Sequence, residues 1–389
     1  MTDYTSEPLP FRVRKGLRYA RLYGPRRTWA KVQSQYHMKR AYDSLPVLTG
    51  ASERAHVGFI GCGNFSFSTI AYYLAKKHGK VIRAAMDVDI ARAASLAERY
   101  GAAFYTDSST ELLEDEAIDL VIIASNHASH AGYAIEALRA GKHVHIEKPH
   151  VVNSAGLIDL CAAMRSAPGR VHLGFNRPAS SFGIKIERAL RSAPGPSMMS
   201  WFVAGHALPP DHWYLRPGEG GRIVGNLCHW TDFVLRMVPA SHRFPVLIRP
   251  TRGERPDSNV AVTYTFADGS IGSITFSEKG APYEGVKEHF SAQQGDVLIS
   301  MEDFRTLTIE RGATKKVTRS LFRDHGHERS IERSYGLRQG GEGDDVAYVW
   351  ETGELFLKTR EALEEDRDVV VEGFDASVWT DLAEGDPPR

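Results

Sequence analysis

The feature that most constrains this chain is an alternation of short apolar runs with helix-like segments between about residue 55 and residue 175. Segments of about ten to fifteen residues with helical spacing separate the runs. The predicted strands cover residues 56–60, 81–86, 120–124, 143–146 and 171–175. Strands that alternate with helices of this length form βαβ units, so the pattern predicts a parallel, Rossmann-like sheet.

The spacing changes after residue 176. One helix is predicted over 223–237, and apolar runs then follow one another closely, with Gly, Asp and Ser between them. Close spacing favours antiparallel or mixed pairing. The predicted fold class is therefore α/β: an N-terminal Rossmann-like domain over residues 51–175, followed over 176–389 by an α+β domain with an open, largely antiparallel or mixed sheet and a C-terminal helix.

Composition excludes several classes of protein. The 389 residues include 48 basic and 48 acidic side chains, so the net charge does not favour a nucleic-acid partner. No apolar stretch reaches the roughly 18 residues that a transmembrane helix needs. Cys62, Cys161 and Cys228 show no paired spacing, which argues against a disulfide framework and fits a reducing, cytoplasmic compartment.

One segment departs from this balance. Residues 11–42 contain ten basic side chains and no acidic one, and Gly24-Pro25 divides them into two predicted helices. We interpret residues 1–50 as a basic helical extension that packs on its own body or on a neighbouring subunit. The alternative is a peripheral contact with anionic lipid or with a protein. The extension carries no site motif, and we expect it to be dispensable for chemistry.

A glycine-rich turn joins the first predicted strand to a helix. Gly61 allows the tight turn, and Gly63 lets the backbone approach a pyrophosphate, while Asn64 and Phe65 open the helix that follows. Ser66 stands where the usual fingerprint has a third glycine. Glycine also serves tight turns for steric reasons alone, but the position at a strand–helix junction favours a dinucleotide site.

An acidic residue ends the second predicted strand. A carboxylate at Asp87 can accept hydrogen bonds from the adenosine ribose hydroxyls and repels a 2′-phosphate, so NAD(H) is predicted in preference to NADP(H). An acid in this segment could alternatively cap the next helix. Asp89 is placed to be the N-cap of the helix that begins at Ile90.

The most specific run is Gly141-Lys-His-Val-His-Ile-Glu-Lys-Pro149. His143, His145 and Glu147 alternate along a strand and share a face, but we predict no metal site. The run resembles the signature of the Gfo/Idh/MocA oxidoreductases. This resemblance implies that Lys148 lies beside the nicotinamide and contacts the reacting hydroxyl, that the pKa of Lys148 is lowered, and that the peptide bond before Pro149 is cis.

The resemblance extends over nearly all of the chain after the basic extension. It implies further cofactor contacts in the loop after the third predicted strand and in the lysine motif: Ser125, Asn126, His130 and Glu147. Asn126 stands where the family usually has proline. It implies substrate contacts at Asn176 and Arg177, although Pro178 replaces a second arginine of that motif.

A longer match implies the proton-transfer residue. His229 matches the catalytic histidine of the family, and Trp213, Arg222 and Asn226 are implied substrate contacts. Many members carry aspartate at the position of Gly225, so proton transfer is left to His229 and Lys148. Residues 287–288, 302–305 and 324–328 also resemble the family, and we interpret them as sheet and connection features.

The resemblance implies an NAD(H)-dependent dehydrogenase or reductase. It would move a hydride to or from a secondary hydroxyl or ketone of a sugar, or of a nucleotide- or lipid-linked sugar derivative. An NAD-dependent glycosidase on the same fold is one alternative. A cofactor-binding regulator without full catalytic machinery is another, which Gly225 favours. A homodimer or homotetramer is expected to form through the C-terminal sheet.

Overall fold

The computed structural model describes residues 4–50, 52–255, 258–280 and 285–375. Six strands form a fully parallel sheet in the order β3-β2-β1-β4-β5-β6. They are β1 (Val57–Ile60), β2 (Ile82–Met86), β3 (Phe104–Thr106), β4 (Leu120–Ile123), β5 (His143–Ile146) and β6 (Val171–Leu173). The strand order reverses between β1 and β4, which is where open sheets of this kind bind their ligands.

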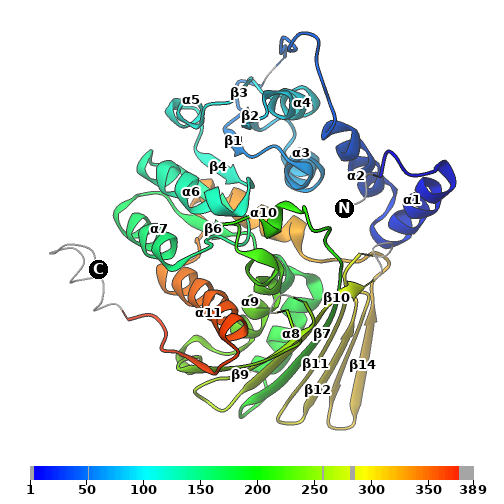
Figure 1. Cartoon of the computed structure of the whole chain (residues 1–389), viewed down its shortest axis with the longest axis vertical. Helices are drawn as coiled ribbons and strands as arrows, with labels where there is room; N and C mark the ends of the chain where they lie inside the picture. The colour runs from blue at the N-terminus through cyan, green and yellow to red at the C-terminus, as the bar shows by residue number, and fades with distance from the viewer. Residues whose placement is uncertain (1–3, 51, 256–257, 281–284, 376–389) are drawn as a thin grey trace.

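Helices cover both faces of this sheet (Figure 1), which explains why its strands are apolar throughout. One face packs against α3 (Ala71–His78), which follows a π-helical turn over Ser66–Ile70, and against α4 (Ile90–Tyr100). The other packs against α5 (Ser109–Glu114), α6 (His130–Arg139) and α7 (Ser154–Ser166).

The second sheet has nine strands in the order β14-β13-β12-β11-β7-β10-β9-β8-β15. They are β7 (Ser197–His206), β8 (Val246–Arg252), β9 (Val260–Thr265), β10 (Ile271–Gly280), β11 (Lys287–Gln294), β12 (Val297–Glu302), β13 (Thr306–Arg311), β14 (Thr314–Arg319) and β15 (Val369–Val371). Every pair is antiparallel except β7 with β10. The predicted fold class is thus confirmed.

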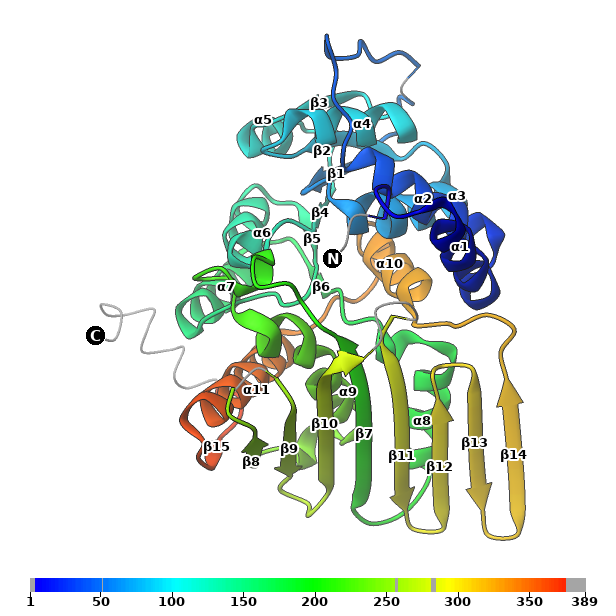
Figure 2. The same ribbon diagram turned by 45° about the vertical axis from the view of Figure 1, so that its right-hand side comes forward.

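Within the described ranges, helices cover one face of this second sheet. They are α8 (Ser181–Arg191), α9 (Cys228–Met237) and α11 (Val346–Glu365). The opposite face is open in Figure 2, and its exposed apolar side chains include Met198, Phe202, Ile271 and Leu298. Buried and exposed residues alternate along β11 and β12, as expected of a sheet with one packed and one open face.

The prediction misses several observed elements, among them β3, α5, β14 and β15. Three others lie close to the candidate site or at the centre of the large sheet. Strand β7 lies between β10 and β11 at the centre of the large sheet, and helices α8 and α10 (His327–Gly336) flank the site. The helix predicted over 223–237 begins as a π-helical turn over Ile223–Leu227 before α9. Helix α8 does have a helical period, with Phe182, Ile186 and Leu190 buried on one face, so the sequence reasoning overlooked a signal that was present.

The C-terminal part of the chain returns to the parallel sheet. Ile331 and Tyr335 of α10 join the same core as α3 and α4, and Phe356 of α11 packs with α7. The two sheets are therefore bound together by shared helices, and the residues between them are held by elements from both halves of the chain.

The basic extension folds as α1 (Leu9–Tyr23) and α2 (Pro25–His37), which are joined at Gly24 with φ 86°. Both views place α2 beside α3. The outward face of α1 exposes Leu9, Val13 and Leu17. No helix within the described ranges is long and apolar enough to cross a bilayer.

Candidate active site

The glycine turn after β1 is shaped by close backbone approach. Gly61 has φ 91°, and a Cβ there would lie 2.5 Å from the Ser125 nitrogen, so the turn requires glycine. A Cβ on Gly63 would meet no atom within 4 Å of the described structure, which leaves room for a ligand above the backbone. Ser66 stands at the position of the third glycine, and its buried Oγ donates to the Gly61 oxygen at 2.6 Å.

Asp87 lies at the carboxyl end of β2 as predicted. Its Oδ2 accepts a hydrogen bond from the Cys62 nitrogen at 2.7 Å, and its Oδ1 accepts one from the Asp89 nitrogen at 2.9 Å. The carboxylate is thereby fixed beside the glycine turn. Asp89 caps α4 by accepting from the Ala91 nitrogen, which confirms the N-cap prediction.

The loop after β4 is tied to the lysine motif through His130. Its Nδ1 lies 2.7 Å from the Pro149 oxygen, its Nε2 lies 3.2 Å from the Ser125 oxygen, and the ring is buried. Burial also lowers the pKa of His130. Both ring nitrogens of the predicted cofactor residue His130 are therefore engaged by main-chain oxygens of the two loops.

Glu147, another predicted cofactor residue, is largely buried under the motif. Its Oε1 lies 3.2 Å from His145 Nε2, and its Oε2 accepts from the Lys148 nitrogen at 3.3 Å. His145 Nδ1 in turn contacts Ser334 of α10 at 2.6 Å. In the described ranges, no group of three or more His, Cys, Asp or Glu residues is arranged to hold a metal ion.

A segment before α9 reaches across to the loop after β4. Glu219 accepts hydrogen bonds from Asn126 Nδ2 at 2.7 Å and from the Ala128 nitrogen at 3.1 Å. The ring of Trp213 lies 4.5 Å from that of His127. Asn126 and Trp213, which the sequence assigned to cofactor and substrate, thus come together at one junction between the two halves of the chain.

Lys148 is followed by a cis peptide bond to Pro149, as predicted. Its Nζ donates to the Gly225 oxygen at 2.9 Å and so reaches from β5 to the turn before α9. The predicted lowering of its pKa is wrong. Burial does act to lower the pKa of Lys148, but Tyr214, Cys228 and Glu147 outweigh burial, and the pKa is raised.

The departure at Gly225 has a steric explanation. A Cβ at this position would lie 2.6 Å from His127 Cε1 and 2.9 Å from Tyr214 Cε2. Those two rings occupy the space that an aspartate side chain would need. Burial lowers the pKa of His127 to about 2, so this ring is neutral at physiological pH.

His229 lies in the first turn of α9. Burial, Arg177 and Lys148 lower its pKa well below that of a free histidine, so the ring is neutral at pH 7. Its Nδ1 is buried and has no hydrogen-bond partner in the described structure. An unpaired buried ring nitrogen costs free energy, and at a candidate active site it therefore calls for an explanation.

Behind His229 lies a buried ionic network that the sequence reasoning assigned to connections. Arg177 Nε donates to Glu288 Oε1 at 2.5 Å, and Trp230 Nε1 donates to the same oxygen at 2.8 Å. His325 Nε2 lies 3.3 Å from Glu288 Oε2. Arg177, a predicted substrate residue, is therefore engaged by Glu288, while Glu288 and His325 join the site.

The remaining predicted substrate residues lie in different surroundings. Asn176 is buried and donates through Nδ2 to the His325 oxygen at 2.7 Å. The Arg222 guanidinium carbon lies 5.3 Å from the centre of the Phe276 ring. Asn226 lies in the π-helical turn and is partly exposed.

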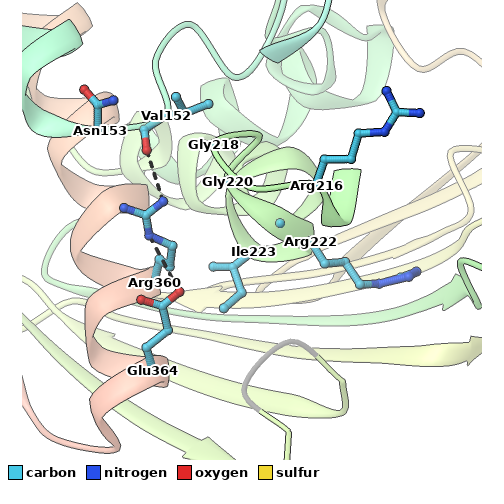
Figure 3. A pocket seen from close by; sticks show the side chains of 10 residues that line it. Val152, Asn153, Arg216, Gly218, Gly220, Arg222, Ile223, Arg360 and Glu364 are labelled. Carbon is cyan, nitrogen blue, oxygen red and sulfur yellow. Dashed lines mark hydrogen bonds and ion pairs between the residues drawn. The ribbon is translucent and has the colours of Figure 1, made fainter. Parts of the chain in front are cut away.

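Arg222 also lines a cavity of about 570 Å³ between α11 and the turn before α9 (Figure 3). Arg216 and Arg360 line the same cavity. Arg360 NH1 donates to the Val152 oxygen at 3.0 Å, and Figure 3 shows its side chain beside Glu364. Lys148 and His229 do not line this cavity.

Comparison with known proteins identifies the class of the N-terminal domain. Residues 55–175 match the family model of the Gfo/Idh/MocA oxidoreductases, described as an oxidoreductase family with an NAD-binding Rossmann fold. This domain of the chain belongs to that family.

Two curated relatives illustrate the likeness. Inositol 2-dehydrogenase 2 of Saccharopolyspora erythraea is 32% identical over 35% of this chain and 41% of its own length. Myo-inositol 2-dehydrogenase of Thermotoga maritima is 23% identical over 81% of this chain and 98% of its own length. The first alignment thus spans less than half of that relative.

Among solved structures, levoglucosan dehydrogenase in complex with NADH and levoglucosan has a TM-score of 0.71 and 17% identity. The superposition covers 82% of this chain and 99% of that one. At this identity the likeness shows the shared fold: a parallel sheet followed by a large mixed sheet.

Proposed function

We propose that this protein is an NAD(H)-dependent oxidoreductase that moves a hydride to or from a secondary hydroxyl or ketone of a sugar or sugar derivative. The observation that carries the proposal is the neutral, partly buried His229 ring, whose buried Nδ1 is unpartnered in the described structure and whose pKa responds to Lys148. The inositol and levoglucosan dehydrogenases among the similar proteins support a polyhydroxylated substrate.

The residues present fit a dinucleotide. Gly63 leaves open space above the turn, and Asp87 holds a carboxylate at the end of β2. Asn64, Phe65, Ser125 and Asn126 complete the set that we assign to the cofactor. When bound, the nicotinamide ring supplies the carbon that accepts or donates hydride.

The protein supplies proton transfer and orientation. In the oxidative direction, the substrate hydroxyl proton passes to the neutral His229, while Lys148, which is protonated at pH 7, stabilises negative charge developing on the oxygen. In the reductive direction the same proton returns from His229. Asn226 and Trp213 are our proposed contacts for the other hydroxyls of the substrate.

We propose NAD(H) in preference to NADP(H). Asp87 accepts two backbone hydrogen bonds that fix its charge where a 2′-phosphate would lie. Fluorescence titration with both reduced cofactors tests this. Tighter binding of NADPH than of NADH would contradict it.

We also propose self-association through the open face of the large sheet. Met198 and Phe202 of β7 and Ile271 of the paired strand β10 are exposed there, and Leu298 is exposed on β12, beyond β11. Exposed apolar side chains gathered on one face favour an interface in soluble proteins. Light scattering should give the molar mass of a dimer or tetramer. The double variant Phe202→Glu, Leu298→Glu should give a smaller molar mass.

The decisive experiment for the activity is a turnover assay on a panel of inositols, anhydrosugars, nucleotide sugars and aryl glycosides with NAD⁺ or NADH. Cofactor-coupled oxidation or reduction of one class is the expected result. Release of the aryl group with retained cofactor would indicate the glycosidase. Cofactor binding without turnover on any member would favour the regulator.

A further inference from the structure

The basic extension contacts the glycine turn directly. Lys31 of α2 donates through Nζ to the Asn64 side chain. One turn and a half further on, His37 Nε2 lies 2.7 Å from the Cys62 oxygen, and its ring stacks on Phe67 at 4.1 Å. Two residues of α2 therefore meet the segment that we assign to the cofactor pyrophosphate.

The charge on Lys31 is uncompensated. Burial, Arg27 and Lys15 together lower the pKa of Lys31 to about 8, so the ammonium group still predominates at pH 7. Within the described ranges it forms no ion pair, and its one hydrogen-bond acceptor is a neutral amide oxygen. A desolvated cation of this kind is costly unless an anion accompanies it.

A second cation follows the same face of α2. Arg27 NH2 donates to Thr69 Oγ1 at 2.6 Å, and its NH1 is buried without a partner in the described structure. The guanidinium lies over the rings of Tyr72 and Tyr73. Two positive groups thus face the helix that begins at the glycine turn, and neither has a carboxylate partner there.

The other end of the extension reaches the substrate side. The Arg323 nitrogen donates to the Leu22 oxygen at 2.7 Å, and Arg323 NH1 donates to the Tyr23 hydroxyl at 3.2 Å. The Tyr23 ring lies 6.0 Å from His325, the neighbour of Glu288. These contacts anchor the extension at both ends, so Lys31 is held in place.

We propose that Lys31 is a binding residue for the cofactor, supplied by the N-terminal extension, whose ammonium group pairs with the pyrophosphate when it occupies the open space above Gly63. The inference rests on the proposed function, because it assumes that a dinucleotide binds at this turn. Binding would exchange the neutral Asn64 oxygen for a charged phosphate oxygen, and a charge-assisted hydrogen bond is the stronger of the two.

The test compares cofactor affinity in full-length variants. Lys31→Met should weaken the binding of NADH and ADP-ribose about 10- to 100-fold, as expected for loss of one charge-assisted hydrogen bond. Titration calorimetry measures the dissociation constants. Lys31→Arg should retain most of the affinity. Lys39→Met, which removes an exposed lysine of the same extension, is the matched control and should bind like the parent protein.

Two further readouts separate a charge effect from a structural one. Adenosine carries no phosphate, so its affinity as a competitor of NADH should be unchanged in Lys31→Met. The dependence of NADH affinity on salt should also be weaker in that variant. Equal NADH affinity in Lys31→Met and the parent, or an equal loss of adenosine binding, would overturn the inference. Failure of the parent protein to bind NADH at all would instead overturn the proposed function.

Discussion

At the scale of single residues, the proposed chemistry depends on a histidine kept neutral by its surroundings. His229→Gln removes the proposed proton acceptor but keeps a polar side chain at this position, so we expect turnover to fall by about 10²–10⁴-fold. The affinity for NADH should change by less than about threefold, because the glycine turn and Asp87 lie on other elements. Steady-state kinetics beside a cofactor titration measures both.

His242→Gln is a matched control for that variant, because His242 is an exposed histidine beyond the end of α9. It should leave kcat unchanged. Near-native turnover in His229→Gln would assign proton transfer to another group. Lys148→Met is less informative, because its Nζ also joins β5 to the turn at Gly225.

At the scale of secondary-structure elements, β11 contributes one buried carboxylate to the packing behind α9. Glu288 is fully buried, and its pKa is lowered by Arg177 and His325 against the opposing effect of burial. Glu288→Gln leaves Arg177 without a counter-charge, which costs about 3–5 kcal/mol in buried pairs. Urea denaturation should show this loss, whereas Glu302→Gln on the exposed face of the neighbouring β12 should change stability by less than about 0.5 kcal/mol.

The extension is the second element whose role depends on contacts. The sequence predicts that it is dispensable for chemistry, because it contains no site motif. The structure places Lys31 and His37 against the glycine turn and Tyr23 against His325. We therefore now expect deletion of residues 1–48 to weaken cofactor binding, and contact with lipid or protein through the outward face stays a prediction.

At the scale of the whole molecule, buried neutral histidines make stability depend on pH. Burial lowers the pKa of His150 to about 3, against about 6.5 in an unfolded chain. Below pH 6.5 the unfolded state therefore binds more protons than the folded state. The stability contributed by the neutral His150 ring is fully present above pH 6.5 and is lost as the pH falls towards 3. Each such histidine lowers the free energy of unfolding by about 1 kcal/mol when the pH falls from 7 to 5.5.

Denaturation curves at those two pH values measure this effect. His150→Gln should reduce the loss of stability on acidification by about 1 kcal/mol. His289→Gln, at an exposed position on β11, should leave the pH dependence as it is in the parent. An unchanged slope in His150→Gln would mean that His150 titrates alike in the folded and unfolded states.

Local patterns by themselves determined the parallel sheet, its glycine turn and the acid at the end of β2, whereas the cis bond before Pro149 was expected from the resemblance to a family. Each of these depends on residues that are close in the sequence: the period of apolar side chains, the steric freedom of glycine, or a short motif. The position of His229 beside Lys148 was available only through the resemblance to a family, since no local pattern joins two residues so far apart in the chain.

Tertiary structure alone decided what surrounds those residues. Glu288 reaches Arg177 across 111 positions, and Arg323 meets Tyr23 across 300. Strand β7 lies at the centre of the large sheet between β10 and β11, which come from later segments of the chain. At Gly225, two rings from other loops fill the space that a side chain would need. Such contacts form only when the whole chain has packed, because burial and the pairing of buried charges are properties of the assembled core and not of any short stretch of sequence.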